Sequence, residues 1–413
     1  MTAPDTTAKR APSDPHPAQR RILAVLTASQ VLGGIGVATG VAISTLAAST
    51  LSGSEAIGGL AQTSAVAGAG VLAVPMARAA ARRGRRAALA IGYGAATAGA
   101  VIATTATALG SWPLLMAGLF LAGGATAGGL AARYAATDLS APGRTARDLS
   151  IVVWATTIGS VAGPNLADPA DRIGRELGLA AWAGPYALAA IAFGLTLAGL
   201  AALLRPDPLH AADRPGKAGP TRPGGGWDVL RTVPLARLAV AAIVVSHTVM
   251  VSIMVMTPVH LDHGNAGLTV VGVVISLHIA GMYALSPLPG WLADRFGRIP
   301  VLLGGMALLA AAAALAAVSA PHHVTRLAIA LVLLGLGWSF GLVGGSALLT
   351  DSVPAERRPA VQGLSDLLMN GGAAVGGLAA GAIVTTLSYG ALATVAMALV
   401  FPMTVALVLT KRG

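Results

Sequence analysis

Long uncharged runs, broken by short charged clusters, dominate this chain between residues 20 and 412. There are ten such runs. Eight are of similar length, and the two longest, from Arg86 to Arg133 and from Asp366 to Lys411, are clearly longer than the rest. A helix needs roughly 20 apolar residues to cross the hydrocarbon core of a bilayer. Each shorter run therefore predicts one membrane-spanning helix and each of the two longest predicts two, which makes twelve.

Composition agrees with this interpretation and excludes other classes of protein. Of the 413 residues, 55% are hydrophobic and 10% are charged, and a soluble fold of this size could not bury so much apolar surface. No cysteine is present, which excludes disulfides and thiolate metal sites. No phosphate-binding loop or nucleophile–base pair is recognisable, and His260 and His263 alone do not make a metal site. We therefore predict no enzyme activity, no cofactor, no bound metal and no nucleotide partner.

The charged clusters predict how the chain is oriented. If the N-terminus is cytoplasmic, 23 of the 27 Lys and Arg residues fall in cytoplasmic segments. An excess of basic residues marks the cytoplasmic side of membrane proteins, so we predict that both termini are cytoplasmic. The net charge of +11 then reflects topology and contact with membrane lipids, and we expect no nucleic-acid partner.

A polar stretch rich in proline, glycine and charge divides the chain into two halves of six spans. We predict a disordered cytoplasmic tail at residues 1–20, helical bundles at 21–204 and 233–413, and a cytoplasmic linker at 205–232. The halves match at a constant offset in residue number, called the duplication offset here. It carries Arg85, Asp138 and Gly159 onto Arg298, Asp351 and Gly372. Internal duplication is typical of transporters built from repeats, whose binding site lies between the halves.

One loop between the predicted helices 8 and 9 carries a family resemblance. The stretch from Gly290 to Arg298, GWLADRFGR, resembles the loop motif of the major facilitator superfamily (MFS). Residues 82–86, RRGRR, resemble a degraded copy between helices 2 and 3. The resemblance implies an all-α membrane fold of two pseudo-symmetric six-helix bundles that rock about a central site, moving a small-molecule substrate across the membrane.

The residues of this motif have physical roles. Glycines permit the tight turn and arginines hold it in the lipid headgroup layer, while Asp294 can face the positive end of helix 5 in the other half and latch the cytoplasmic side shut. The simpler alternative is that both loops only set topology. In the first copy Ala81 stands where the family has an acid, and Ala77 replaces the leading glycine. The motif candidates are Gly290, Asp294, Arg295, Gly297, Arg298, Arg82, Gly84 and Arg85.

A second resemblance lies in predicted helix 5. Gly159, Gly163 and Pro164 resemble the Gly-x-x-x-Gly-Pro motif of the antiporter branch of the superfamily. Small residues four apart let two helices approach closely, and proline bends a helix by removing a backbone hydrogen bond. Gly-x-x-x-Gly patterns also occur in many membrane bundles. The resemblance implies a proton antiporter.

Ionisable residues inside membrane spans are costly and are therefore functional candidates. Asp366, His247 and His278 are the three that stand out. A histidine changes charge near neutral pH, and a carboxyl group removed from water holds its proton more readily, so each can carry a coupling proton. Each histidine can equally be neutral and hydrogen-bonded to a neighbouring helix. Asp366 can instead be a structural partner of Arg133 or a cap near the start of its helix.

Other polar and aromatic residues within the spans are candidates for the substrate cavity. Arg133, near the cytoplasmic end of predicted helix 4, can reach the headgroups, pair with Asp138 or line the vestibule. Aromatic and amide side chains can bind a substrate or hold helices together. These further candidates are Gln30, Gln62, Trp154, Trp338 and Asn370.

Taken together, the sequence predicts a secondary transporter that exports small amphipathic or drug-like compounds in exchange for protons. One alternative is an uptake symporter or facilitator for a metabolite such as a sugar or organic acid, and another is a receptor or scaffold that no longer transports. We expect a monomer in the cell membrane of a bacterium. The substrate is not predicted.

Overall fold

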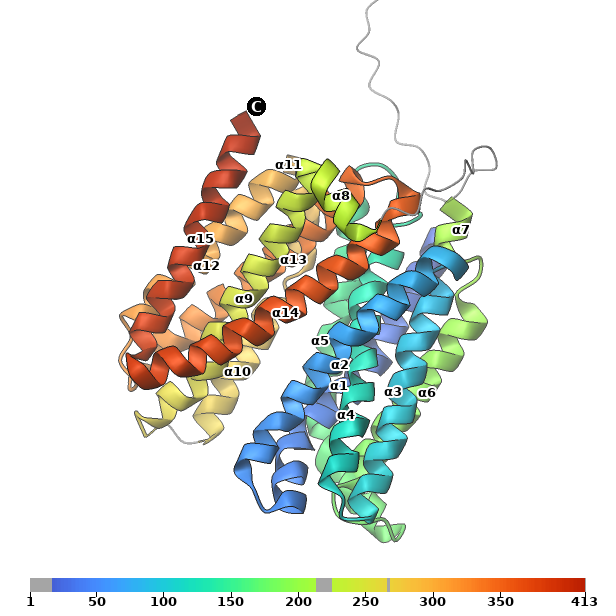
Figure 1. Ribbon diagram of the computed structural model, residues 1–413, viewed down its shortest axis with the longest axis vertical. Helices are drawn as coiled ribbons and strands as arrows, with labels where there is room; N and C mark the ends of the chain where they lie inside the picture. The colour runs from blue at the N-terminus through green and yellow to red at the C-terminus, as the bar shows by residue number, and fades with distance from the viewer. Residues whose placement is uncertain (1–16, 213–224, 266–267, 413) are drawn as a thin grey trace, which may run out of the picture.

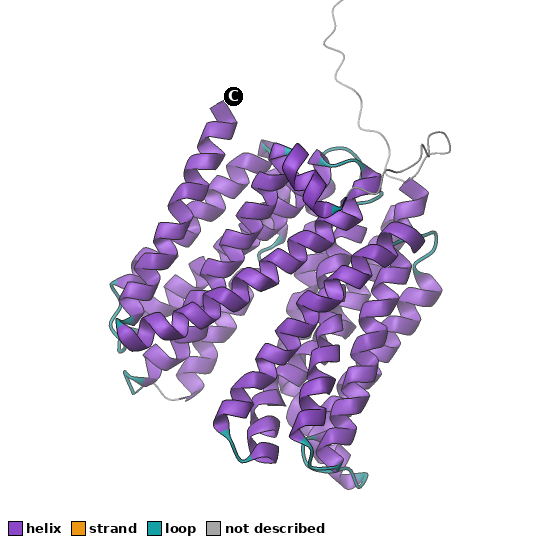
Figure 2. Cartoon of the chain, viewed as in Figure 1, coloured by secondary structure: helices purple, strands orange, loops and turns teal. Residues whose placement is uncertain are grey.

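The computed structural model describes residues 17–212, 225–265 and 268–412. These residues form helices joined by short loops, with no strand among them (Figure 2). Twelve helical segments within them are long and apolar enough to cross a membrane, which confirms the number of spans predicted from the uncharged runs. Residues 1–16 of the predicted tail and 213–224 of the predicted linker lie outside the described part of the chain.

Six helices form the first bundle, called the N bundle here. They are α1 (Gln19–Ser52), α2 (Glu55–Arg83), α3 (Arg85–Ala108), α4 (Trp112–Ala135), α5 (Thr145–Glu176) and α6 (Ala183–Leu203).

The second bundle, the C bundle, also has six spans. The eighth span of the chain is broken before Pro287 into two helices, α10 and α11. The helices are α9 (Pro234–Asp262), α10 (Leu268–Tyr283), α11 (Pro287–Phe296), α12 (Arg298–Ala317), α13 (Val324–Ser352), α14 (Arg358–Thr386) and α15 (Tyr389–Arg412). Two short helices, α7 (Pro208–Ala212) and α8 (Gly226–Thr232), lie within the predicted linker, and a 3-10 turn, η1 (Ala355–Arg357), precedes α14.

Small residues let the helices pack closely, and they do so in the same way in both bundles. A Cβ added at Gly124 of α4 would lie 2.5 Å from the carbonyl oxygen of Gly92 on α3. In the C bundle, a Cβ at Gly337 of α13 would lie 3.1 Å from the carbonyl oxygen of Gly305 on α12. The duplication offset carries the first pair of glycines onto the second. Because lipid tails are as apolar as side chains, such close packing is a main source of helix association in membranes.

The Gly-x-x-x-Gly-Pro motif packs α5 against α1. A Cβ at Gly159 would lie 2.7 Å from Gly34 Cα, and a Cβ at Gly163 would lie 2.8 Å from the backbone nitrogen of Thr39. The Thr39 hydroxyl also donates a hydrogen bond of 3.0 Å to the Gly163 carbonyl. The contact therefore joins two helices of the same bundle.

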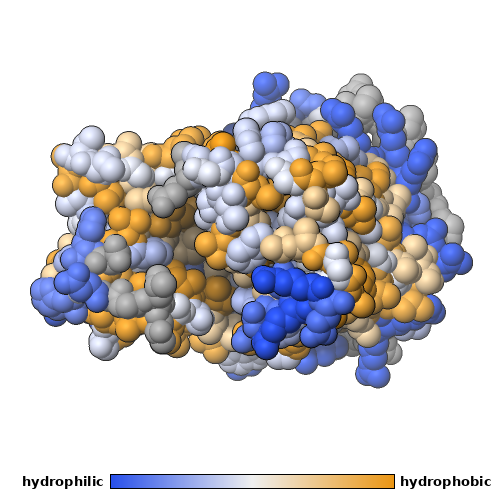
Figure 3. All heavy atoms as spheres, turned by 90° about the horizontal axis from the view of Figure 1, so that it is seen from below, coloured by the Kyte–Doolittle hydropathy of each residue, from blue (hydrophilic) through white to orange (hydrophobic). Residues whose placement is uncertain are grey.

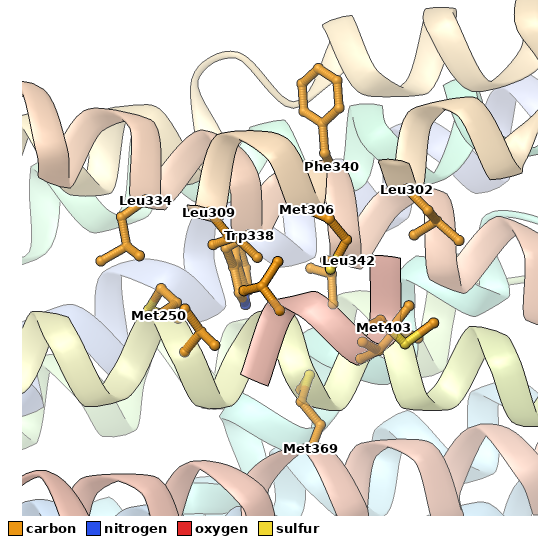
Figure 4. Packing of buried hydrophobic residues seen from close by; sticks show 14 of the residues in the cluster. Met250, Leu302, Met306, Leu309, Leu334, Trp338, Phe340, Leu342, Met369 and Met403 are labelled. Carbon is orange, nitrogen blue, oxygen red and sulfur yellow. The ribbon is translucent and has the colours of Figure 1, made fainter. Parts of the chain in front are cut away.

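Buried apolar side chains fill the C bundle and continue into the N bundle. Met250, Leu309 and Trp338, from α9, α12 and α13, are members of one large cluster (Figure 4). Tyr134 and Leu149 of the N bundle belong to the same cluster. The two bundles thus share a continuous apolar core where they touch.

The bundles meet at one end of the molecule and separate toward the other. Helix α8 lies at the closed end, which is called the linker end here (Figure 1). At this end Gly363 of α14 is so close to Ala77 of α2 that an added Cβ would clash with the alanine, and Gly290 meets Ser150 of α5 in the same way. Seen from the opposite end, the molecule is hollowed between the bundles (Figure 3).

Candidate functional site

Three layers of polar side chains lie between the bundles, stacked from the linker end inwards. Helix α14 begins at the linker end and carries Gln362 in the first layer and Asp366 one turn deeper in the second. His247 belongs to the third layer, because it lies near the middle of α9, roughly 20 Å along the helix axis from its start. The first two layers, which join the bundles, therefore lie between the third layer and the linker end.

The first layer is built around Arg85 at the start of α3. Its Nε donates to Asp138 Oδ2 at 2.7 Å and its Nη2 donates to Asp138 Oδ1 at 3.1 Å, which makes a two-pronged ion pair within the N bundle. The same Nη2 crosses to the C bundle and donates to Gln362 Oε1 at 2.7 Å. Asp207 in turn accepts the backbone N–H groups of Arg85 and Arg86, so it caps α3.

Asp294 lies at the N-terminus of α5, as its motif suggested. Its two carboxylate oxygens accept the backbone N–H groups of Ala146 at 3.1 Å and Arg147 at 2.8 Å. Arg298 holds this carboxylate from the other side at 3.1 Å and also donates to Asp351 at 2.8 Å. A carboxylate at a helix N-terminus is stabilised by hydrogen bonds and by the helix dipole, and this one joins α11 of the C bundle to α5 of the N bundle.

The second layer contains an ion pair that joins the bundles. Arg133 Nη2 of α4 lies 2.6 Å from Asp366 Oδ1 of α14, and the two residues are 1% and 4% exposed. Arg133 Nε also donates to Ser346 Oγ of α13 at 3.1 Å, and Nη2 donates to the Tyr134 hydroxyl at 3.2 Å. In the structure Arg133 is paired with Asp366 and does not extend to the lipid headgroups. Asp138, the other acid considered, is bound to Arg85.

A small cavity connects the first two layers. Arg85, Tyr134, Gln362 and Asp366 line it together with apolar residues of α2, α3 and α4. Asn370, one turn beyond Asp366, donates its side-chain amide to the Asp366 backbone carbonyl at 2.7 Å. Asn370 therefore hydrogen-bonds within its own helix.

The third layer is aromatic and belongs to the C bundle. Trp338 Nε1 of α13 donates to His247 Nδ1 of α9 at 2.8 Å. Tyr283 of α10 meets the Trp338 ring edge-on, with ring centroids 5.5 Å apart. His247 and Tyr283 are partly buried, whereas Trp338 is buried and supports the other two from behind.

His278 of α10 is hydrogen-bonded to the backbone of a neighbouring helix. It is fully buried, and its Nδ1 lies 2.8 Å from the backbone carbonyl of Leu331 on α13. A carbonyl oxygen can only accept, so Nδ1 carries the proton. This arrangement matches the alternative of a neutral histidine bonded to a neighbouring helix.

The remaining candidates lie outside the three layers. Gln30 of α1 donates to Thr156 Oγ1 of α5 at 3.1 Å, within the N bundle. Gln62 of α2 and Trp154 of α5 are exposed. Of the motif arginines, Arg82 is exposed and Arg295 lies against the rings of Trp291 and Phe296.

Comparison with known proteins identifies the family. The sequence model of the Major Facilitator Superfamily matches residues 25–269 and 265–412. YddS, an uncharacterized MFS-type transporter of Bacillus subtilis, is 36% identical over 378 residues, which are 90% of this chain and 86% of YddS. The riboflavin transporter RfnT of Brucella anthropi is 30% identical over 371 residues, 89% of each chain. This chain belongs to the Major Facilitator Superfamily. It is a multi-pass membrane transporter and not an enzyme.

Solved structures of this superfamily share the fold. The human organic anion transporter MFSD10 superposes with a TM-score of 0.75 at 15% identity, over 95% of this chain and 100% of that one. FucP in its outward conformation gives a TM-score of 0.70 at 14% identity, over 92% of this chain and 97% of FucP. These likenesses confirm the MFS fold predicted from the loop motif, and at such identities they concern the fold alone.

Several site residues of this MFS transporter were missed by sequence reasoning. Ser346, Tyr134, Gln362 and Tyr283 are polar residues next to the candidates that were named. One signal could have found Ser346, because the duplication offset carries Arg133 onto this serine, its partner in the structure. Equivalent positions that lie next to the axis between the bundles can meet across it, as Arg133 and Ser346 do.

Proposed function

We propose that this MFS transporter exports small amphipathic compounds in exchange for protons, and that Asp366 carries the coupling proton. The observation that supports this is the buried ion pair of Asp366 with Arg133, which joins the two bundles. Two charges out of water hold each other strongly, and neutralising one of them leaves the other without compensation. A proton on Asp366 therefore weakens the contact that holds the bundles together.

The hydrogen bonds favour Asp366 over both histidines as the proton carrier. His247 accepts the N–H of Trp338 at Nδ1, so a second proton on the ring would break that bond. A second proton on His278 would go to its buried Nε2, which has no hydrogen-bond partner among the described residues. Of the three candidates, only Asp366 is placed so that protonation acts directly on a contact between the bundles.

The linker end is cytoplasmic in this proposal, with both termini on that side and the bundles at 21–204 and 233–413 rocking about linker 205–232. The hollow then faces outward. A proton that reaches Asp366 from outside loosens the Arg133–Asp366 pair, and the bundles separate at the cytoplasmic side while the outer side closes. Release of the proton into the cytoplasm restores the pair. The protein works as a monomer in the bacterial cell membrane.

Export is the proposed direction because Gly159, Gly163 and Pro164 pack α5 tightly against α1, as suits an antiporter seam. A second candidate function is uptake of an aromatic metabolite. Its specific support is RfnT, 30% identical and named a riboflavin transporter. A proton gradient should drive the compound out of the cell if the protein exports it, and into the cell if the protein takes it up. A receptor or scaffold would transport no compound.

Flux in proteoliposomes with an imposed pH gradient tests the proposal. Substituting Asp366→Asn should abolish proton-driven movement while leaving exchange of substrate between the two sides. This variant also leaves Arg133 uncompensated, which costs about 3–5 kcal/mol for a buried pair. The double variant Arg133→Gln, Asp366→Asn removes both charges and serves as the matched control for folding. A pH dependence unchanged from the wild type in either variant would contradict the role of Asp366.

A further inference from the structure

A hydrogen bond between α9 and α13 fixes the protonation of His247. Trp338 Nε1 lies 2.8 Å from His247 Nδ1. An indole N–H can only donate, so Nδ1 is the acceptor and the ring proton lies on Nε2. Trp338 is held in place, since it is buried and packs edge-on against Tyr283. His247 is therefore neutral, with a single N–H that points away from the tryptophan.

That N–H donor is unused by the protein. No described residue hydrogen-bonds to Nε2 of His247 or to the hydroxyl of Tyr283, and both side chains are only partly buried. Both also lie within electrostatic range of Arg133, which belongs to the opposite bundle. Two unused hydrogen-bond donors of the C bundle thus lie near a charged side chain of the N bundle.

The internal duplication shows that packing alone does not require these side chains. The positions of the N bundle that the duplication offset pairs with His247, Tyr283 and Trp338 all hold small residues. They are Gly34, Gly70 and Ala125. The same fold is built there without an aromatic layer, so the layer in the C bundle needs another reason.

We propose that His247 Nε2–H and the Tyr283 hydroxyl bind the transported substrate, and that this substrate carries a carbonyl or carboxylate oxygen beside a planar ring. The oxygen satisfies the two donors and is attracted by Arg133. The planar ring packs on the flat apolar surfaces of the two side chains. This inference rests on the proposed transport function and names the class of its substrate.

Nitrogen NMR of 15N-histidine-labelled protein tests the fixed tautomer without any ligand. The His247 signal, identified by its loss in His247→Gln, should show a bare Nδ1 and a protonated Nε2 between about pH 5 and 8, where a free histidine changes charge. In Trp338→Phe the donor to Nδ1 is gone, so the tautomer is no longer fixed and the His247 signal should show a population with the proton on Nδ1. Titration of His247 in the wild type over this range would overturn the inference.

Binding to the purified protein tests the substrate class, with two planar probes. Riboflavin presents carbonyl oxygens on a flat ring, and ethidium has a flat ring without an oxygen acceptor. Riboflavin should bind at least about tenfold more weakly to His247→Phe, and within about threefold of the wild type to His247→Gln, which keeps an N–H near the position of Nε2. Ethidium should bind both variants and the wild type alike.

Two results would overturn the substrate class: tighter binding of ethidium than of riboflavin, or riboflavin binding that His247→Phe leaves unchanged. Asp366→Asn should bind riboflavin at least as tightly as the wild type, because the carboxyl group is not one of the two donors and its removal leaves the charge of Arg133 unpaired. A negative binding result for the His247 variants would therefore not contradict the role of Asp366 in proton coupling. A negative flux result for Asp366→Asn would likewise not contradict the binding role of His247.

Discussion

The two seams that close the linker end are related by the internal duplication but are held together differently. At the α5–α11 seam, Asp294 accepts the first N–H groups of α5. At the α2–α14 seam the equivalent position is Ala81, and the bond between bundles runs from Arg85 to Gln362. The duplicated backbone keeps both contacts close. The polar groups that join the bundles differ between the two seams, so the free energy needed to open each seam can differ.

The small residues at the seams have exchanged places. The α5–α11 seam pairs Gly290 on the motif helix with Ser150 on the partner helix. The equivalent pair in the α2–α14 seam is Ala77 and Gly363, with the glycine on the partner helix instead. Each seam keeps one glycine, since two side chains cannot fit at this distance. The loss of the motif glycine at position 77 is thus compensated on α14.

The arginine–aspartate pairs beside the seams differ in burial. In Arg85–Asp138 the side chains are 4% and 0% exposed, whereas in Arg298–Asp351 they are 15% and 40% exposed. A buried pair is costly to break by removing one partner, and an exposed pair contributes little. The α2–α14 seam is therefore closed through the buried Arg85 of the N bundle, and the α5–α11 seam through the capping carboxylate of Asp294 in the C bundle.

The largest expected effect comes from filling the glycine position of the α5–α11 seam. Gly290→Ala places a methyl group against Ser150 and 2.8 Å from the Ala146 carbonyl. Such overpacking costs about 1–3 kcal/mol, so the linker end should open about 5- to 150-fold more often. Because the chain has no cysteine, labelling of a single Ala73→Cys reporter between α2 and α14 measures opening directly.

The matched control recreates the arrangement of the other seam. Adding Ser150→Gly to Gly290→Ala gives the alanine–glycine pair that Ala77 and Gly363 form, and should restore part of the closure. Ala77→Gly alone should change labelling little. If the double variant labels as fast as Gly290→Ala, the two seams are not interchangeable and the exchange of small residues has another cause.

The capping carboxylate gives a smaller effect. Asp294→Ala removes two hydrogen bonds and the favourable charge at the start of α5, which together contribute about 1 kcal/mol and correspond to about fivefold more opening. The reciprocal variant Ala81→Asp introduces the missing acid at the other seam and should slow labelling of the same reporter. Unchanged labelling in Asp294→Ala would mean that the Asp294 contact only accompanies closure.

Much of the fold could be predicted from the sequence because bilayer physics is simple. Uncharged runs such as Arg237 to Asp262 have to be helices, since lipid offers no partner for backbone groups. The Asp294 contact was also accessible, because its motif fixes both the acid and the helix end. The unbroken run across Tyr283 concealed the division of that span into α10 and α11.

The partners of the candidate residues were harder to predict. Which residue Arg133 meets depends on how the bundles lie together, and local sequence left several alternatives open. Trp338 is a cavity candidate with helix packing as its alternative, and the structure buries it behind His247. The rotation of a helix about its own axis decides which of its side chains face the other bundle. A uniformly apolar sequence gives little information about that rotation.

The smallest expected effect concerns the bond that replaces the missing acid at the α2–α14 seam. Gln362→Leu removes the acceptor of Arg85 across the bundles but leaves the Arg85–Asp138 pair intact. One such hydrogen bond contributes about 0.5–1.5 kcal/mol, and the low end applies because Arg85 keeps its ion pair with Asp138, so labelling of the Ala73→Cys reporter should rise about two- to threefold. Gln362→Glu keeps an acceptor and adds a charge opposite to the arginine, so it should slow labelling instead. If both substitutions raise labelling equally, the side chain acts by packing alone, and only the α5–α11 seam is closed by a specific polar contact.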